Sequence, residues 1–331
     1  WSYLCDGDGC CPRSGTPLSD HALSLGYLDV TEPSVYVRFP LTSGPLADQA
    51  ALLVWTTTPW TLISNTAVAV HPDVRYVAVR LHETDAEEPA ETLVVAEPLV
   101  ASVVGERAHD GVAAFTGREM EHWTYARPFE LLDFDGQRAH YVVLADYVTT
   151  EDGTGLVHQA PAFGADDLAV SRVYGLPVVN PVRPDGTFDE KLPLVGGVFF
   201  KTADEALVAD LRDRGLLYRL TPYEHSYPHC WRCDTALLYY ALPSWYIRTT
   251  EIKDELRREN EKTTWYPDTI KHGRYGDWLR NNIDWALSRN RFWGTPLPLW
   301  TCENGHLSCV GSRAELGELA GVEQGRLAAD A

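Results

Sequence analysis

The stretch Trp55-Thr-Thr-Thr-Pro-Trp-Thr61, followed by Asn65, is the most informative part of this chain. It holds four threonines and two tryptophans in seven residues. Several hydroxyls beside bulky apolar walls can form a small pocket that binds a polar group in a fixed orientation. In an extended strand Thr56 and Thr58 share one face and Thr57 the other, and the proline ends the strand or lies at an edge. The alternative is a β-branched strand that is stabilised by packing alone.

Residues 153–167, Gly-Thr-Gly-Leu-Val-His-Gln-Ala-Pro-Ala-Phe-Gly-Ala-Asp-Asp, supply the imidazole and the carboxylates that the threonine stretch lacks. The Gly-Thr-Gly turn allows the backbone to approach a ligand closely. His158 follows two apolar residues, and Asp166 and Asp167 fall at an expected helix start. A carboxylate in a partly apolar pocket is a natural partner for an ammonium group. The alternatives are a core histidine for His158 and a helix N-cap for Asp166.

Several common catalytic patterns are missing from the sequence. No nucleophile elbow, phosphate-binding P-loop or dinucleotide fingerprint occurs. The spacing of the threonines, His158 and the aspartates does not support a nucleophilic triad either. A site that hydrolyses an ester would therefore more simply use a positioned water.

The composition is that of a folded protein of two or three domains. The chain has 331 residues, of which 45% are hydrophobic. No apolar run reaches the roughly 20 residues that span a bilayer, and no signal-peptide pattern opens the chain. It begins at Trp1, within what reads as the inside of a domain, so we expect a piece of a longer cytoplasmic protein.

The charge argues against indiscriminate nucleic-acid binding, because the formal net charge is −19. A local basic tract at residues 248–291 remains a candidate for docking tRNA. The alternative is a solvated helix face, since acidic residues are interleaved with the basic ones.

Hydrophobic alternation predicts a compact, β-rich α+β domain over about residues 35–215. Helices are expected at residues 166–174 and 203–214, and the pattern becomes helical from about residue 250. Strands are expected at residues 34–40, 51–57, 75–81, 92–96 and 140–144.

Four ordered motifs resemble the isoleucyl-tRNA synthetases, which are class I aminoacyl-tRNA synthetases. The threonine stretch, with Asn65 and residues 66–73, resembles the threonine-rich peptide of the editing domain, and residues 153–167 resemble the second editing motif. Tyr-Pro-His-Cys-Trp-Arg-Cys at residues 227–233 and Ser-Arg-Asn-Arg-Phe-Trp-Gly-Thr-Pro-Leu-Pro at residues 288–298 match further blocks. The valyl and leucyl relatives carry an arginine early in the threonine-rich peptide, so its absence here favours the isoleucyl branch.

The resemblance implies a proofreading reaction in protein biosynthesis. In this family the region is an insertion in the catalytic domain, and it acts as an aminoacyl-tRNA deacylase on mischarged valyl-tRNA(Ile). One methylene separates isoleucine from valine and is worth ~1–3 kcal/mol, a value known for this family rather than derived from this chain. A second, smaller pocket therefore accepts valine and excludes isoleucine.

The resemblance assigns the site residues to three tasks. Asp167, rather than Asp166, would hold the α-ammonium of the substrate. His158 and Trp60 would shape the valine pocket and exclude isoleucine. The others would hold the terminal nucleotide, and the threonines among them would also position the attacking water: Thr56, Thr57, Thr58, Asn65 and Tyr227. Catalysis is thus expected from Thr56, Thr58 and Asp167.

The implied fold class is α+β, with a β-barrel-like editing domain, surrounding helices, a zinc-knuckle neck and part of the class I catalytic domain. The neck would comprise residues 1–33 and 219–250, and the editing domain residues 34–218. Residues 251–331 would return into the catalytic domain.

Seven cysteines fall in tight groups, which in a chain without a secretion signal suggests metal binding more than disulfides. Cys230 and Cys233 have zinc-knuckle spacing. The family pairs this knuckle with an earlier Cys-x-x-Cys, which here reads Cys11-Pro-Arg-Ser14. A structural zinc on Cys11, Cys230 and Cys233 is therefore expected. Its fourth ligand could be Cys10 or Cys5; the alternative is a degraded site with free thiols.

A second metal site is only hinted at. Cys302, His306 and Cys309 lie close in sequence, and any further ligands would fall outside this chain.

The family's ATP-binding His-Ile-Gly-His and Lys-Met-Ser-Lys-Ser motifs are absent from this chain. ATP and Mg²⁺ would therefore serve only a longer parent that ligates isoleucine to tRNA(Ile). The expected partner is the 3′ end of tRNA(Ile) carrying valine, with no membrane and no protein partner.

Two other functions compete with the editing hydrolase. One is a non-catalytic, zinc-stapled module that positions tRNA and is inactive in isolation. The other, an unrelated zinc-ribbon binding protein, leaves the threonine stretch and residues 153–167 unexplained.

Overall fold

The computed structural model describes residues 2–3, 8–18, 26–82, 90–240, 245–287 and 297–321. The chain forms two compact units, Tyr3–Ser244 and, with Trp1–Ser2, Trp245–Ala331. Strand β1 (Ser2–Tyr3) begins the described chain. The larger unit carries the threonine stretch, residues 153–167 and the two cysteine knuckles, Cys11–Ser14 and Cys230–Cys233. Cys5 and residues 288–296 of the fourth motif lie outside the described residues.

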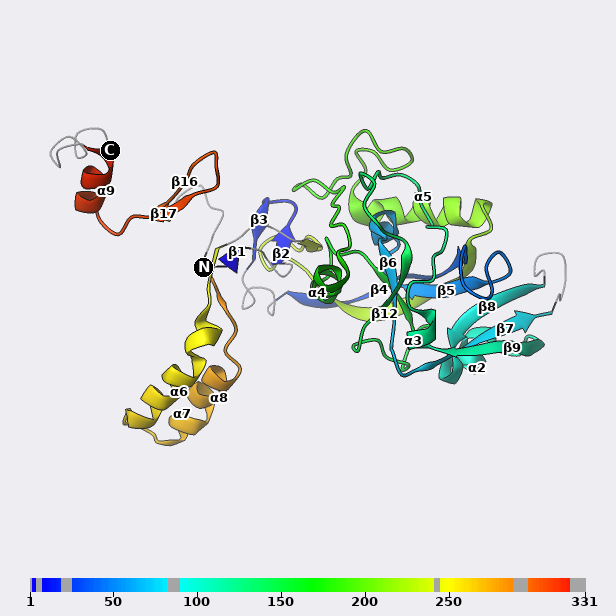
Figure 1. Ribbon diagram of the computed structural model, residues 1–331, viewed down its shortest axis with the longest axis horizontal. Helices are drawn as coiled ribbons and strands as arrows, with labels where there is room; N and C mark the ends of the chain where they lie inside the picture. The colour runs from blue at the N-terminus through cyan, green and yellow to red at the C-terminus, as the bar shows by residue number, and fades with distance from the viewer. Residues whose placement is uncertain are drawn as a thin grey trace. The chain divides into compact units, whose positions relative to one another are not determined.

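The larger unit is built on a mixed, six-stranded sheet (Figure 1). Its central strand β5 pairs antiparallel with β4 and parallel with β8. The strands expected at residues 34–40, 51–57, 75–81 and 92–96 are confirmed. In spatial order the strands are β12 (Leu217–Pro228), β4 (Tyr27–Pro40), β5 (Ala51–Thr56), β8 (Glu91–Ala96), β7 (Arg75–Leu81) and β9 (His109–Thr116).

A three-stranded sheet carries the second motif. Its order is β10 (Tyr141–Leu144), β6 (Ala67–Val70) and β11 (Leu156–Gln159). All four residues of β6 are buried, because the main core packs on one face and a second apolar cluster on the other. The antiparallel pairing of β11 with β6 places His158 opposite Val68. Strand β11 also contacts β5 of the main sheet, so the motifs at residues 55–61 and 153–167 lie close together.

Helices flank these sheets. Helix α5 (Phe200–Asp213) buries an apolar face and contacts the 3₁₀ helix η1 (Pro59–Ser64). Helix α4 (Ala165–Tyr174) follows Gly164. The helices expected at residues 166–174 and 203–214 are therefore confirmed, with starts one and three residues earlier. The remaining short helices of the unit are η2 (Glu97–Leu99), α2 (Val100–Val104) and α3 (Gly117–Met120).

The sheets of the described residues are open, and the expected barrel-like domain is not closed. Strands β12 and β9 are the two edges of the six-stranded sheet. Most side chains of β9 are exposed. Because most of its side chains are in contact with solvent, this edge strand has no buried face that a further strand would have to cover.

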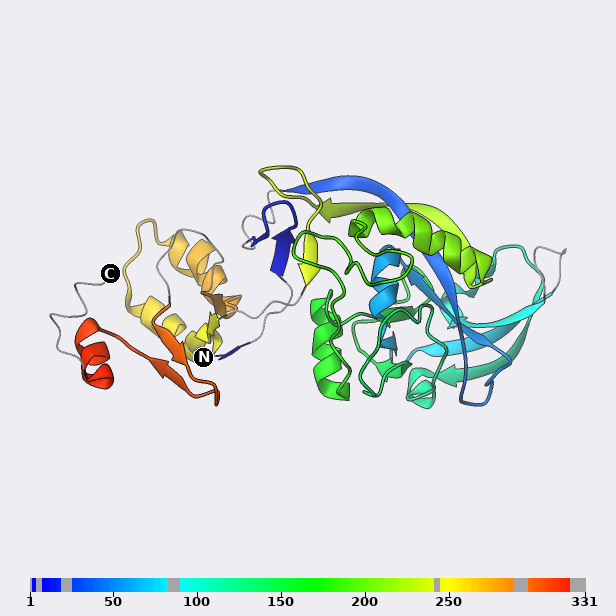
Figure 2. The same ribbon diagram turned by 90° about the horizontal axis from the view of Figure 1, so that it is seen from above.

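Strands β4 and β12 run on beyond the sheet as a two-stranded ribbon, seen in blue and yellow-green in Figure 2. Their pairing extends from Val37 opposite Leu217 to Tyr27 opposite Pro228. The ribbon leads to a small sheet, in which β13 (Leu238–Tyr240), β2 (Asp8–Cys11) and β3 (Thr16–Pro17) lie in that order. This arrangement places the two cysteine knuckles beside each other.

The smaller unit is mainly helical from residue 249 to residue 280, as expected. Its strands pair as β14 (Trp245–Ile247) with β15 (Trp285–Ala286), and β16 (Leu299–Thr301) with β17 (Leu307–Cys309). Its helices are η3 (Thr249–Ile252), α6 (Lys253–Lys262), α7 (Thr269–His272), α8 (Arg274–Arg280) and α9 (Arg313–Ala320).

Among the described residues, several members of the basic tract are paired with nearby acids. Ion pairs three residues apart join Arg248 to Glu251, Arg257 to Asp254, Arg258 to Glu255, Lys262 to Glu259 and Arg280 to Asp277. Over the described residues these pairs favour the solvated helix face over a basic docking patch. None of the described helices combines the length and the apolar character that crossing a bilayer requires.

Candidate functional site

The threonine stretch ends a strand and starts a short helix. Strand β5 stops at Thr56, and Pro59 is the first residue of η1, where its missing N–H costs nothing. The Thr56 and Thr58 hydroxyl oxygens are 3.2 Å apart, so the two side chains lie on one side as expected. The backbone N–H of Thr58 donates to Thr56 Oγ1 at 3.1 Å, and Thr61 Oγ1 lies 3.1 Å from Thr58 Oγ1. The three hydroxyls therefore form one connected chain.

His158 joins this chain from strand β11. Its Nε2 lies 2.9 Å from Thr61 Oγ1, and Thr61 donates its own proton to the Thr58 carbonyl at 2.8 Å. A Thr61 hydroxyl that donates to this carbonyl has no second proton, so it accepts from His158, and the imidazole then carries its proton on Nε2. Burial lowers the pKa of His158 to about 4, so the ring is neutral at pH 7. Its buried Nδ1 lone pair has no hydrogen-bond partner among the described residues.

Asp167 lies at the third position of helix α4, and its carboxylate reaches back to the end of β11. Oδ2 accepts the backbone N–H of Ala160 at 2.8 Å. Oδ1 accepts the Tyr147 hydroxyl at 3.3 Å, and that hydroxyl accepts from Gln159 Nε2 at 2.7 Å. Burial raises the pKa of Asp167 to about 6 despite these donors. Asp166, by contrast, is exposed, and the N-cap of α4 is Gly164.

Aromatic packing connects the two motifs a second time. Phe163, in the loop before α4, packs edge-on against Trp60, with ring centroids 4.8 Å apart. Phe200 of α5 meets another edge of the same indole at 4.8 Å. Trp60 is consequently buried, and its Nε1 has no partner among the described residues. The loop of residues 160–164 is thus held against η1 by packing as well as by the hydrogen bonds at either end.

The Gly-Thr-Gly turn fits closely against the main sheet. Gly153 and Gly155 have φ angles of +72° and +74°. A Cβ on Gly153 would lie 2.6 Å from the Trp55 ring, and one on Gly155 would lie 2.4 Å from the Cβ of Ala96. Glycine is needed for both the backbone angle and the space, so this turn sets where β11 and His158 begin.

Two of the expected binding residues are occupied by the protein itself. Asn65 is fully buried, donates to the Ala67 carbonyl at 2.9 Å and accepts from Tyr125 at 2.7 Å. Tyr227 is buried on the ribbon and donates to the Leu237 carbonyl at 2.8 Å. Its ring lies under Lys201, whose Nζ is 3.8 Å from the ring centroid.

No local sequence signal indicates that Asn65 and Tyr227 are buried. Thr57, the remaining expected binding residue of the threonine stretch, is half-buried.

Three residues beside the site were not identified from the sequence. Thr61 connects the Thr58 hydroxyl to His158, and it could have been found because it belongs to the threonine stretch. Tyr147 has no local signal, because it precedes Asp167 by twenty residues. Asp204 falls among the buried apolar positions of α5, and a charged residue on the apolar face of a helix is a signal that the sequence contains. Burial raises its pKa to about 7, and its Oδ1 has no partner among the described residues.

Three cysteines gather at the end of the ribbon. The sulfurs of Cys11, Cys230 and Cys233 lie within 4.8 Å of one another, and Cys11 Sγ is 3.6 Å from Cys233 Sγ. A tetrahedral zinc with Zn–S bonds of ~2.3 Å places its sulfurs ~3.8 Å apart, so the spacing fits such an ion. Cys10 packs into the main apolar core, whereas Cys11 packs with Cys230, because neighbouring residues of β2 face opposite sides.

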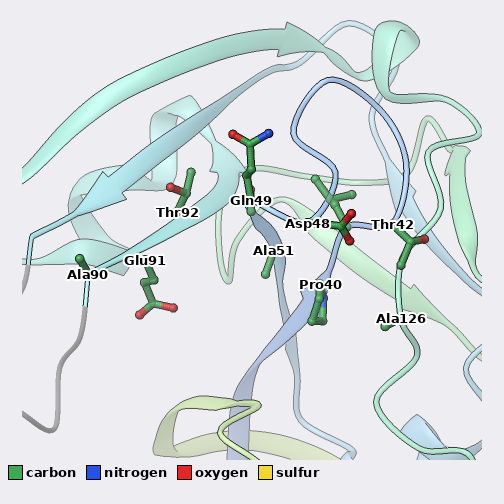
Figure 3. Close-up of a pocket in the computed structure, with 11 residues that line it drawn as sticks. Pro40, Thr42, Asp48, Gln49, Ala51, Ala90, Glu91, Thr92 and Ala126 are labelled. Atoms are coloured by element: carbon green, nitrogen blue, oxygen red, sulfur yellow. The ribbon is translucent and has the colours of Figure 1, made fainter.

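The pocket shown in Figure 3 lies away from all of these residues. Its volume is about 580 Å³, and it opens at the start of β5 beside Ala51 and Glu91. Thr56 is at the other end of the strand, ~17 Å away at the usual rise per residue. Glu91 is held there by ion pairs with Arg38 and Arg107, and Asp48 lines the same pocket. We assign no part of the candidate site to it.

Comparisons with known proteins identify the relatives of this chain. A family model described as "tRNA synthetases class I (I, L, M and V)" matches residues 15–329. A protein of Streptomyces coelicolor named isoleucine–tRNA ligase is 71% identical over 317 residues, covering 96% of this chain and 30% of that protein. The enzyme of the same name from Thermus thermophilus is 49% identical over 92% of this chain and 28% of its own length. The chain therefore spans about 30% of these relatives.

Among solved structures, a crystal structure of GlLeuRS-CP1 overlaps 57% of this chain and 98% of its own chain, with 16% sequence identity and a TM-score of 0.44.

Proposed function

Because the chain belongs to the class I tRNA synthetases for isoleucine, leucine, methionine and valine, we propose that its larger unit is an editing domain that hydrolyses valyl-tRNA(Ile). The observation that supports this best is the hydrogen-bonded link from Thr58 through Thr61 to His158. Two residues after His158, the backbone N–H of Ala160 donates a hydrogen bond to the Asp167 carboxylate. Hydroxyls, a neutral imidazole and a carboxylate thus meet at one strand end and loop.

Asp167 supplies the charge that recognises the substrate. The hydroxyl chain and the neutral His158 carry no charge, so Asp167 is the anion to which an α-ammonium would bind. Pairing with an ammonium favours the ionised carboxylate, and it would offset the burial that raises the pKa of Asp167. The ammonium would in turn fix the ester carbonyl of the substrate relative to the threonines.

Thr56 and Thr58 would position the attacking water and the ribose hydroxyls. Each hydroxyl has two lone pairs and one proton, and the bonds inside the chain leave acceptor capacity on both residues. A water held there attacks the ester carbonyl, the bond to the ribose oxygen breaks, and the ribose oxygen leaves with a proton. Thr57, between Thr56 and Thr58 in the sequence, would also contact the terminal nucleotide. Asn65 and Tyr227 would act indirectly, since their polar atoms are already bonded within the protein.

His158 and Trp60 would set the size of the pocket for the amino-acid side chain. Both are buried and held by neighbours, His158 by Thr61 and Trp60 by two phenylalanines. Rigid walls are required when a site must reject one additional methylene. Truncation of His158 should therefore admit isoleucine.

A structural zinc at the cysteine cluster would hold the two ends of the neck together. The three thiols fit a tetrahedral ion in spacing and in ligand type, and Cys11 and Cys230 are buried. Their separation by more than two hundred residues means that one ion would close a long loop of chain. The zinc would have no part in hydrolysis.

The remaining assignments follow from the relatives. We place the editing domain at residues 34–218, the neck at residues 1–33 and 219–250, and part of the catalytic domain at residues 251–331. The longer parent would ligate isoleucine to tRNA(Ile) with ATP and Mg²⁺ in the cytoplasm, and the 3′ end of that tRNA would be the partner of the editing site.

The test is deacylation by the purified chain of valyl-tRNA(Ile) and isoleucyl-tRNA(Ile), alongside valine esterified to adenosine as a minimal substrate. We expect loss of valine and retention of isoleucine. Asp167→Ala should abolish turnover by removing the counter-charge of the ammonium. Asp166→Ala is the matched control, because it removes the neighbouring, exposed carboxylate and should leave turnover unchanged.

The competing function predicts a different pattern. A tRNA-positioning module would bind tRNA(Ile) yet release no valine from either substrate. Turnover that survives Asp167→Ala would exclude Asp167 from the site. If the His158→Ala variant still does not hydrolyse isoleucyl-tRNA(Ile), a residue other than His158 keeps isoleucine out of the pocket.

A further inference from the structure

The two cysteine knuckles have the same backbone turn. In the first, the Cys11 carbonyl accepts from the N–H groups of Ser14 at 3.2 Å and Gly15 at 2.8 Å. In the second, the Cys230 carbonyl accepts from the N–H groups of Cys233 at 3.1 Å and Asp234 at 2.8 Å. The last residue of each turn has a left-handed φ angle, +60° at Gly15 and +54° at Asp234. The first turn is therefore a knuckle in every respect except its final ligand.

Ser14 consequently takes the position that Cys233 takes in the second turn. Cys11 and Cys230 are buried, whereas Ser14 and its neighbours Arg13 and Gly15 are exposed. Among the described residues, the side of the cluster that a fourth thiolate would close thus carries the small, neutral Ser14 side chain. A neutral hydroxyl is a much weaker ligand for zinc than a thiolate.

We propose that this cluster is an open, three-thiolate metal site whose fourth position, beside Ser14, faces water and accepts an exchangeable ligand. Structural zinc sites carry four protein ligands, whereas sites with three protein ligands keep one position for water or another small ligand. The class of ligand that would fit best is a small thiolate, because the other three ligands are sulfur. Binding of such a ligand replaces the water, and a thiol donor loses its proton to solvent.

This inference rests on the proposed zinc site and not on the proposed hydrolysis. It also excludes Cys10 as the fourth ligand, since Cys10 faces the main core. The test is spectroscopic. The metal-site proposal can therefore fail while the chain still deacylates valyl-tRNA(Ile), and it can hold while deacylation is absent.

The experiment loads the whole chain with Co²⁺ under a phosphine reductant and records the visible and charge-transfer absorption. Titration with mercaptoethanol should shift the wild-type spectrum toward that of a four-sulfur site. Ser14→Cys should show the four-sulfur spectrum at once and no response to mercaptoethanol. Loss of zinc to a chelator should be about tenfold or more slower in Ser14→Cys than in the wild type.

Three controls make the outcome decisive. Ser14→Ala should behave as the wild type, because a water rather than the hydroxyl fills the position. Cys10→Ala and Cys5→Ala should also leave the wild-type spectrum unchanged, and a change in either would identify that residue as the fourth ligand and overturn the proposal. A wild-type spectrum that ignores mercaptoethanol, or a wild type that binds no metal while Ser14→Cys binds one ion, would overturn it equally.

Discussion

Thr61 Oγ1 lies 2.9 Å from His158 Nε2, and this bond joins the two motifs that the sequence separates by 97 residues. The bond is buried, and the same Thr61 hydroxyl lies 2.8 Å from the Thr58 carbonyl oxygen. Burial keeps the His158 ring neutral, and the tautomer of the ring and the direction of the hydroxyl chain are coupled through this contact. The site is therefore as sensitive to Thr61 as to the residues proposed to touch substrate.

Replacement of Thr61 by valine should destabilise the larger unit by ~1–3 kcal/mol. The change keeps the shape of the side chain but leaves the buried Nε2–H of His158 without an acceptor. The measurement is urea unfolding followed by alkylation of the buried Cys10 thiol, resolved by peptide mass spectrometry. Thr42→Val is the matched control, because its hydroxyl bonds Thr124 on the exposed surface and should matter by less than ~0.5 kcal/mol. Equal midpoints for the two variants would contradict a buried, necessary bond.

The rate of deacylation should fall with acid as Asp167 gains a proton. Because burial raises the pKa of Asp167 to about 6, kcat/KM should decrease about tenfold for each pH unit below 6. In the bound complex the ammonium favours the carboxylate, so the corresponding inflection in kcat should lie at lower pH. Stopped-time assays with valine esterified to adenosine would show this. A profile that stays flat from pH 7 to pH 5 would argue against a role for the Asp167 carboxylate.

Asp204→Asn should stabilise the larger unit at pH 8 and not at pH 4. The carboxyl ionises at about pH 7 when folded and near its ordinary value of 3.8 when unfolded. Between those values only the unfolded state releases the proton, so wild-type stability falls as the pH rises and levels off above 7. The full difference corresponds to at most ~4 kcal/mol at pH 8.

The same Cys10 labelling at pH 4, 6 and 8 would measure this effect. A stability difference between Asp204→Asn and the wild type that does not change with pH would refute the assignment.

Gly155→Ala should cost more stability than Gly136→Ala, although the two residues share nearly the same backbone angle. Their φ angles are +74° and +72°, so the strain from a left-handed backbone, ~1 kcal/mol, is common to both. A Cβ at Gly136 meets nothing within 4 Å, whereas one at Gly155 lies 2.4 Å from the Cβ of Ala96. We expect an additional ~1–3 kcal/mol at Gly155 from overpacking. Equal losses measured by urea unfolding would show that the turn can move away from β8.

The local elements of the larger unit were predictable because their signals are local. The alternation of β7 and the two-sided burial of β5 produce strands at the expected residues, and the apolar stripe of α5 produces its helix. The long ribbon of β4 and β12 was not predicted, because the outer half of β4 is mostly solvent-exposed and carries no clear apolar alternation.

The residue types of the candidate site could be named from the sequence, but their contacts could not. Thr56, Thr58, His158 and Asp167 were candidates on sequence grounds, whereas the Tyr147–Asp167 contact depends on the placement of helix α4. Asn65 was expected to face a ligand, and its amide is instead bonded to Ala67 and Tyr125. The Asn65–Tyr125 and Tyr147–Asp167 bonds join residues 60 and 20 positions apart, and no local propensity encodes such pairings.

The family of this chain, the order of its motifs and most strands of its main sheet can be read from the printed residues, as can the chemical groups available for a reaction. Which of those groups lie in contact depends on how the elements pack. This packing turns Cys11 toward Cys230 and Cys10 into the core, and it closes the hydroxyl chain on His158. The physical reason is that periodicity specifies one element at a time. Strand register and close packing then fix which faces of distant elements come together.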